Sequence, residues 1–287
     1  MKKLNVQMYS LGHDNNDPFI KSFETLASFG YTGVEFAGSN YDGLSVEDMK
    51  AALANAGLEA VSSHVQLAKM EEDIPYMAAL GAKMIICPMH AFKGVDEAKR
   101  FAEMLNKYGK IAAEYGMKVG YHNHTQEFWP TEGKPVLDYV IENTDPALVG
   151  FQLDCGWCSC AGINPVDDIN KFPGRFMAIH VKENNRAMGP EEPHSMDEPN
   201  GGRPPMKFDE NGKPIFPPEF LAKMEERNKL NCATGEGIVD WKAVKAAADA
   251  QSTTGDILYI VEREANYGGL DRLTCLKADA AWCLANL

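Results

Sequence analysis

The chain has few features that would target it to a membrane or to nucleic acid. Its 287 residues contain no apolar run long enough to span a bilayer, and residues 1–17 hold no apolar stretch of signal-peptide length. Basic residues are also few, because 28 Lys and Arg face 41 Asp and Glu, a formal net charge of −13. An acidic surface repels phosphate backbones. We therefore expect a cytoplasmic protein with no membrane or nucleic-acid partner.

The sequence also lacks the two separated pairs of cysteines that are typical of a structural zinc site. Cys155, Cys158 and Cys160 lie close together among the seven cysteines of the chain. A structural zinc site usually needs four soft ligands, often as two separated pairs, and no second pair is present. We therefore expect reduced thiols, as is usual in the cytoplasm.

A glycine-rich phosphate loop does not follow the first strand, where the sequence reads Leu11-Gly12-His13-Asp14. This disfavours an open doubly wound sheet that binds nucleotides. Short apolar segments instead alternate with helical patterns, as is typical of parallel strands that are covered on both faces. Eight such units in this length predict an α/β protein with a single (β/α)8 TIM barrel over residues 1–287. The expected strands are Asn5–Leu11, Gly33–Ala37, Ala60–Val65, Met84–Pro88, Lys118–His124, Val149–Asp154, Phe176–Lys182 and Ile257–Glu262.

Helix boundary signals separate these strands. Asp17 is expected to cap a first helix with Pro18 at its first position, and Gly30 to end it. Ser45 with Asp48 resembles a capping box. The later helices are expected at residues 46–56, 68–80, 96–115, 136–143, 166–171, 241–250 and 270–287.

A long segment rich in proline and glycine, residues 184–235, interrupts this alternation after the seventh strand. It is too long for a simple loop between barrel elements. An insertion there would emerge at the carboxyl ends of the strands, where the active sites of such barrels lie. We expect it to act as a lid or as a subunit contact.

Polar residues collect at the expected strand ends, where burial would be costly unless they were paired or liganded. The parallel strands bring these ends to one face of the barrel. Mixed carboxylates and imidazoles suit one divalent metal ion, with Mn²⁺ as the first choice and Mg²⁺, Co²⁺ or Zn²⁺ as alternatives. The residues concerned are Glu35, His64, His122, His124, Glu127, Asp154, His180, Lys182, Glu262 and Glu264.

Six short motifs resemble the sugar phosphate isomerase/epimerase family of xylose-isomerase-like barrels, which includes inosose dehydratases and ketose 3-epimerases. The resemblance implies one metal ion held by Glu, Asp, His and Glu from the last four strands. Asp154, His180 and Glu262 match the last three ligands. We favour Glu127 as the first ligand, with His122 or His124 as alternatives. The motifs are YTGVEFAG (31–38), YHNHTQEF (121–128), LDCGW (153–157), HVKE (180–183), GEGIVDW (235–241) and IVERE (260–264).

The resemblance also implies roles at the barrel mouth. Glu262 is the first candidate for the catalytic base, since a carboxylate of the last strand has that part in ketose epimerases of the family. His124 is a possible acid–base partner, and Lys182 could stabilise an oxyanion. The residues expected to contact substrate are Glu35, His64, His122 and Trp157.

These observations predict a metal-dependent isomerase or epimerase that acts on a keto sugar through a metal-bound enediolate. One alternative is a dehydratase or lyase that acts on an inosose or a 3-keto glycoside, including glycoside cleavage. The imidazoles of the fifth strand, in place of a glutamate, keep this alternative open. An alternative of another class is a non-catalytic sugar-binding protein or partner subunit. The expected partners are a small sugar substrate and possible homo- or hetero-oligomeric subunits.

Overall fold

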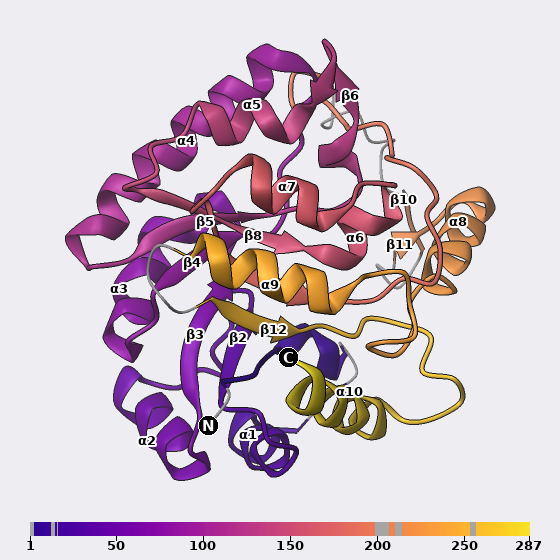
Figure 1. The fold of residues 1–287 in the computed structure, drawn as a ribbon. Coiled ribbons are helices and arrows are strands. Elements are labelled where there is room, and N and C mark those ends of the chain that lie inside the picture. The colour runs from indigo at the N-terminus through magenta and orange to yellow at the C-terminus, as the bar shows by residue number, and fades with distance from the viewer. Residues whose placement is uncertain (1–2, 13–14, 16, 199–206, 210–213, 253–256) are drawn as a thin grey trace.

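The computed structural model describes residues 3–12, 15, 17–198, 207–209, 214–252 and 257–287. Eight parallel strands close into a barrel, with helices packed around it (Figure 1). This confirms the predicted (β/α)8 barrel. In order around the barrel the strands are β1 (Asn5–Gln7), β12 (Leu258–Val261), β9 (Phe176–Val181), β8 (Val149–Asp154), β5 (Lys118–His122), β4 (Met84–Cys87), β3 (Glu59–His64) and β2 (Gly33–Ala37).

The helices lie close to their expected positions. Ser45 caps α2 by accepting a hydrogen bond from the Asp48 N–H at 3.1 Å, and Gly57 ends that helix at a positive φ of 73°. The sequence did not predict α6 or α8. The helices are α1 (Phe19–Ser28), α2 (Val46–Ala56), α3 (Met70–Leu80), α4 (Gly94–Glu114), α5 (Val136–Glu142), α6 (Cys155–Cys160), α7 (Pro165–Lys171), α8 (Pro218–Asn228), α9 (Trp241–Gln251) and α10 (Arg272–Asn286).

Two expectations about local structure were wrong. The first strand ends at Gln7, because the Gln7 side chain accepts the Tyr9 N–H at 3.0 Å and starts a 3-10 turn, Met8–Leu11. Helix α1 begins at Phe19 rather than at Pro18. Its first N–H is bound by the Asp42 carboxylate at 3.1 Å, so Asp17 is not the cap.

The barrel interior changes from apolar to polar along the strands. Inward positions alternate along each strand, and at the amino end they form an apolar cluster of Val61, Met84, Ile86, Ala178 and Ile260. The next inward positions toward the carboxyl end are polar. Two strands show this change: β8 has Gly150, Gln152 and Asp154 at these positions, and β9 with its next residue has Ala178, His180 and Lys182. The polar residues are therefore gathered at the mouth.

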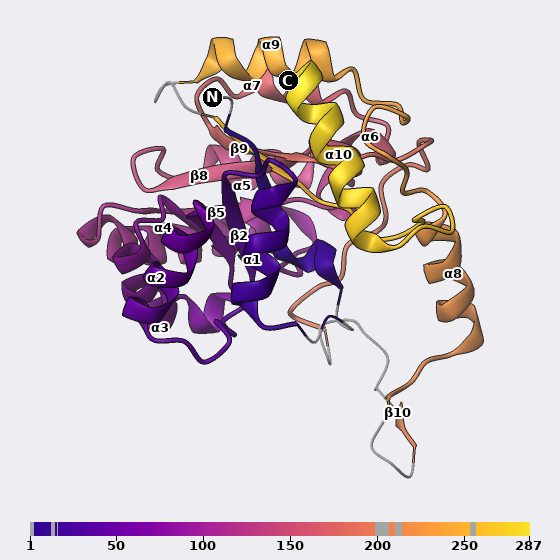
Figure 2. The ribbon, with the colours of Figure 1, turned by 90° about the horizontal axis from the view of Figure 1, so that it is seen from below.

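The predicted insertion lies between β9 and α9 and carries α8 and a short hairpin, β10 (Lys207–Phe208) with β11 (Pro214–Ile215). Figure 2 shows the hairpin projecting away from the barrel, with α8 beside it. The part before the hairpin is fastened to α4 and its preceding loop, since Lys93 pairs with Glu192 at 2.6 Å and Arg100 with Asp197 at 2.5 Å. It therefore lies against the mouth over the loops that follow β4 and β5.

All seven cysteines are free thiols, as expected from the sequence. Among the described helices, none is both long enough and apolar enough to cross a membrane.

Candidate metal and substrate site

Glu35 lies at the centre of a layer of polar side chains inside the barrel, and its side chain is fully buried. Burial alone would raise the pKa of Glu35, but His64 and His180 hold it well below its usual value. The carboxylate is therefore an anion with every lone pair engaged. The side chains that donate to it or pair with it are Ser62 (2.5 Å), Gln152 (2.7 Å), His180 (2.7 Å), Gln7 (2.8 Å) and His64 (3.1 Å).

This position differs from the one expected for Glu35 and His64. Glu35 does not line the mouth as a substrate contact, because the donors around it leave no exposed oxygen. His64 directs its Nε2 to the same layer, 2.8 Å from Gln152 Oε1. Glu35 instead accepts the Nε2 proton of His180, so Nδ1, on the other side of the ring, is the atom that can ligate once its proton is released.

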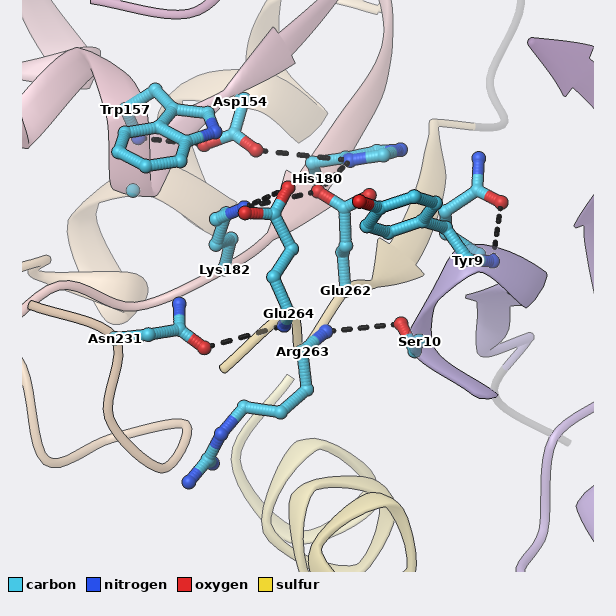
Figure 3. A network of polar contacts seen from close by, with 12 residues as sticks. Tyr9, Ser10, Asp154, Trp157, His180, Lys182, Asn231, Glu262, Arg263 and Glu264 are labelled. Atoms are coloured by element: carbon cyan, nitrogen blue, oxygen red, sulfur yellow. Dashed lines mark hydrogen bonds and ion pairs between the residues drawn. The ribbon is translucent and has the colours of Figure 1, made fainter. Parts of the chain in front are cut away.

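Directly toward the mouth from Glu35, four residues direct one potential ligand atom each to a common point. These atoms all lie within 4.8 Å of one another. His180 Nδ1 is 3.4 Å from Glu262 Oε2 and 3.8 Å from Asp154 Oδ2 (Figure 3). His122 Nε2 is 4.0 Å from the same Asp154 oxygen. We call His122, Asp154, His180 and Glu262 the mouth cluster.

The mouth cluster fits a divalent cation. Asp154 Oδ2 and His180 Nδ1 are buried and have no hydrogen-bond partner within the described part of the chain. Unpartnered buried polar atoms are costly, and two of them facing one another indicate a missing partner. Gln152 Oε1 lies 2.9 Å from His122 Nδ1 and can fix that ring so that Nε2 faces the cluster. Two imidazoles and two carboxylates suit Mn²⁺, Co²⁺ or Zn²⁺.

The structure brings Asp154, His180 and Glu262 together but not Glu127. The Glu127 carboxylate is buried behind β5, where it accepts hydrogen bonds from Tyr121 Oη and the His124 N–H, both at 2.6 Å. Glu127, the preferred first ligand, lies outside the cluster because β5 ends at His122 and residues 126–128 then form a 3-10 turn. His122, one of the alternatives, takes the place in the cluster.

Burial and charge set the protonation of the cluster. Burial and the neighbouring imidazoles lower the pKa of His122 well below its usual value, so this ring is neutral and able to ligate. Burial raises the pKa of Asp154 to about 7. Burial also opposes a charge on His180, but Glu35 and Glu262 outweigh it and raise its pKa to about 10. Protons therefore occupy the site when no cation is bound, and metal binding would release them.

Lys182 is fully buried beside the cluster and is held by two carboxylates. Its Nζ lies 2.6 Å from Glu264 Oε1 and 3.3 Å from Glu262 Oε2 (Figure 3). Burial opposes its charge, but Glu264 and Glu262 raise the pKa of Lys182, so it stays a cation. Glu264 was among the polar residues expected at the strand ends, but no role was predicted for it. Its two-residue spacing from Glu262 is the signal that places both side chains on one face.

Trp157 forms a wall of the mouth and is nearly buried. The Lys182 ammonium lies 4.4 Å from the centre of its ring, and the Arg227 guanidinium of α8 lies 4.2 Å from it. The His124 ring is 6.1 Å away. Burial, Arg227 and Lys182 lower the pKa of His124 to about 3, so it is a neutral imidazole. The sequence motifs did not identify Arg227, because it lies in the insertion.

A close backbone approach fixes the mouth beside Trp157. A β-carbon on Gly156 would come 2.7 Å from the carbonyl oxygen of Lys182, so α6 can pack against the end of β9 only with glycine there. Asp154 in turn caps α6, because its Oδ1 accepts the Trp157 N–H at 2.6 Å. One carboxylate oxygen thus holds the helix, while the other faces the cluster.

Fold and cluster together define a (β/α)8 barrel with a candidate metal centre at the carboxyl ends of its strands. Residues 23–282 match the model of the xylose isomerase-like TIM barrel family, and the chain belongs to that family.

Similar proteins carry names from sugar and cyclitol metabolism. An inosose dehydratase of Clostridium beijerinckii is 28% identical over 206 residues, which cover 62% of this chain and 67% of that protein. A sugar phosphate isomerase/epimerase of Parabacteroides distasonis superposes with a TM-score of 0.74 at 23% identity, covering 99% and 94% of the two chains. The IOLI protein with a bound zinc atom superposes with a TM-score of 0.68 at 13% identity, over 99% and 97%.

Proposed function

We propose that this protein is a metal-dependent dehydratase that removes water from a keto polyol, of the inosose or 3-keto sugar class. One observation carries the choice of reaction. The carboxylates at the mouth, Asp154, Glu262 and Glu264, come from β8 and from the chain after β12, whereas β5 contributes imidazoles. Sequence similarity to inosose dehydratases supports the same reaction class.

The four residues of the mouth cluster would hold the cation, and Glu35 and Gln152 would orient the two imidazoles from below. A divalent cation bound there would act as a Lewis acid on a substrate carbonyl and its neighbouring hydroxyl. This assignment rests on the unpartnered Asp154 and His180 atoms described above.

Glu262 is suited to remove the proton from the carbon beside the carbonyl. Burial would raise its pKa, but Lys182 and His180 hold that pKa well below its usual value, so the carboxylate is ready to accept a proton. The C–O bond of the β-hydroxyl then breaks, and the departing hydroxide takes a proton to leave as water. We assign that proton to Lys182, because hydroxide is far more basic than an amine and His124 is neutral.

Epimerisation requires a proton donor on the face opposite to the base. In a two-carboxylate scheme that donor would be a glutamate on β5, but the structure places His122 at the end of this strand and Glu127 behind it. Elimination needs only one base and one acid. The geometry therefore favours the dehydratase over the epimerase that the sequence put first.

The test compares two outcomes on the same substrates. Mn²⁺-loaded protein is incubated in D₂O with an inosose, a 3-keto glucoside and a simple ketohexose, and the products are followed by proton NMR and mass spectrometry. We expect loss of one water from the inosose or the 3-keto glucoside, and none with chelator. Deuterium incorporation with an epimeric product and no water loss would assign the protein to the epimerases. If no substrate showed deuterium exchange or product formation, the dehydratase and the epimerase would both be contradicted.

An isomerase or epimerase is the second candidate. The fold neighbour of that name and the shared need for a metal cluster support it. A Lys182→Met variant separates the two in the same assay. It should abolish water loss, because it removes the acid, whereas proton exchange by Glu262 should persist at a reduced rate.

A further inference from the structure

The insertion places one arginine, Arg227, at the barrel mouth. Arg227 lies near the end of α8, and its guanidinium stacks on the face of Trp157 at 4.2 Å. Leu230, one turn further, is buried in a small cluster with Trp157 and Cys160. The Asn185 N–H also donates to the Leu230 carbonyl at 2.8 Å. The end of α8 is therefore fixed against α6 and the segment that follows β9, and Arg227 has a defined place over the mouth.

The charge of Arg227 is only partly neutralised. Among the residues that the structure describes, its carboxylate partner is Glu191, at 3.7 Å. The other oxygen of Glu191 pairs with Lys223 at 2.8 Å, so one carboxylate faces two cations. Thr125 from the loop after β5 donates to Glu191 at 3.3 Å and holds it there. Lys182, by contrast, lies between two carboxylates. The positive charge beside Trp157 that carboxylates do not fully neutralise therefore comes from α8, where Arg227 and Lys223 share Glu191.

Two further polar atoms beside Arg227 lack partners. Trp157 Nε1 and His124 Nδ1 are buried, and neither has a hydrogen-bond partner among the residues that are described. Trp157 Nε1 is always a donor, and His124 can donate from Nδ1. A buried donor without an acceptor is costly, so two of them beside an arginine indicate that an acceptor is supplied from outside the chain.

We propose that Arg227, Trp157 and His124 form a subsite for an oxyanion substituent, a carboxylate or a phosphate, on the part of the substrate that extends out of the mouth. This inference rests on the proposed function, since it makes the keto polyol an acidic one. Arginine forms charge-assisted, often bidentate hydrogen bonds with both groups. The two sources differ in charge and geometry, so matched ligands can separate them.

The test measures binding rather than turnover. Three open-chain polyols serve as probes: glucitol, gluconate and glucitol 6-phosphate. Each is titrated by calorimetry into Mn²⁺-loaded protein at one ionic strength. We expect one of the two anions to bind at least about tenfold more tightly than glucitol, equivalent to about 1.4 kcal/mol. The anion with the larger preference identifies the substituent.

Variants of the insertion then locate the preference. Arg227→Gln should reduce the preference to less than about threefold and leave the glucitol affinity unchanged. Glu191→Gln should increase anion affinity, because it removes the competing carboxylate. Lys229→Gln is the matched control, since it removes one positive charge from the solvent-facing end of the same segment, where Lys229 pairs with Glu225 and Glu226. Melting temperatures of all variants verify folding.

Four results would overturn the proposal: no binding of any polyol, no anion preference in the wild type, equal loss of glucitol and anion affinity in Arg227→Gln, or an equal effect of Lys229→Gln. The subsite and the proposed reaction can be contradicted independently. An anion preference without turnover would support the subsite and contradict the dehydratase. Water loss without an anion preference would support the dehydratase and contradict the subsite.

Discussion

The barrel contains two adjacent layers of buried polar side chains that differ in how well they are satisfied. In the lower layer Glu35 is paired with or accepts from five side chains. In the mouth cluster, Asp154 Oδ2 and His180 Nδ1 have no hydrogen-bond partner within the described chain. Both layers are equally buried, so burial alone does not identify a functional site. The layer with unsatisfied atoms is the one that can accept a cation, and the satisfied layer holds it in place.

The largest effect should come from Asp154→Asn, which removes a charged ligand from the mouth cluster. Mn²⁺ at 100 times its dissociation constant stabilises a one-site protein by about 2.7 kcal/mol, which corresponds to a melting-temperature increase of roughly 5 °C. We expect the variant to lose this increase and to lose turnover by at least about 10³-fold. Thermal unfolding with and without Mn²⁺ measures the first, and the water-loss assay the second.

Asp168→Asn is the control for that experiment. Asp168 on α7 is also a buried carboxylate, and burial raises its pKa to about 6, but it lies outside both layers. This variant should keep the full Mn²⁺-dependent increase. If Asp154→Asn kept it too, the cluster would not be the metal site.

A second comparison separates His122 from Glu127. His122→Ala should weaken Mn²⁺ binding on the order of 100-fold, or about 3 kcal/mol, because it removes a ligand. Glu127→Gln should leave the Mn²⁺ affinity nearly unchanged but destabilise the fold by about 1–2 kcal/mol, since Tyr121 Oη and the His124 N–H lose a charged acceptor. Metal titration and urea unfolding of both variants check this. The opposite pattern would restore Glu127 as the first ligand.

Glu35→Gln tests whether the lower layer acts through the upper one. The amide cannot accept all the donors that surround the carboxylate, so the His180 ring loses part of its orientation. We expect about tenfold weaker Mn²⁺ binding, as is usual for residues that orient a ligand, with the metal still able to bind at higher concentration. Isothermal titration gives the affinity. An unchanged affinity together with a lower unfolding free energy would make Glu35 purely structural.

The last prediction concerns pH and Glu183, which is buried outside both layers. It accepts hydrogen bonds from Trp241 Nε1 and the Gly235 N–H, but burial outweighs them and raises its pKa to about 7. The folded state thus favours the protonated acid. Its stabilising contribution is fully present below the unfolded pKa, about 4.3, and is lost as the pH rises through 7.

Between pH 5 and pH 8, apo wild type should therefore lose on the order of 1–3 kcal/mol of stability relative to Glu183→Gln. Urea unfolding of both proteins across this range measures the difference. If the unfolding free energies of the two proteins changed with pH in parallel, burial of Glu183 would not contribute to the pH dependence of stability. Glu35 has the opposite pKa shift because two imidazoles, those of His64 and His180, pair with it in addition to its neutral donors.

The fold was largely predictable because parallel strands covered on both faces are near-continuous apolar segments. Gly33–Ala37 and Val149–Asp154 have the predicted bounds. Strand ends were less predictable. The fifth strand stops at His122 and the first at Gln7, because side chains and turns beyond the apolar core decide where pairing ends.

The site was predictable where a residue sits on a strand and not where it depends on a loop. Asp154, His180 and Glu262 come together because their strands fix their direction. The sequence favoured Glu127 over His122, because it does not show that residues 126–128 follow a path set by contacts with Tyr121. Arg227 could not be predicted as a site residue, because its position depends on how the insertion packs against Trp157.

Gly156 has a consequence for which substitutions this protein can accept. The missing β-carbon lets α6 rest on the backbone of Lys182, and α6 is capped by the carboxylate that faces His180. The spacing of the ligand set is thereby set by two main chains in contact, not by the volumes of surrounding side chains. A single methyl group at position 156 would therefore push α6 away from Lys182 and displace the Asp154 carboxylate that caps it.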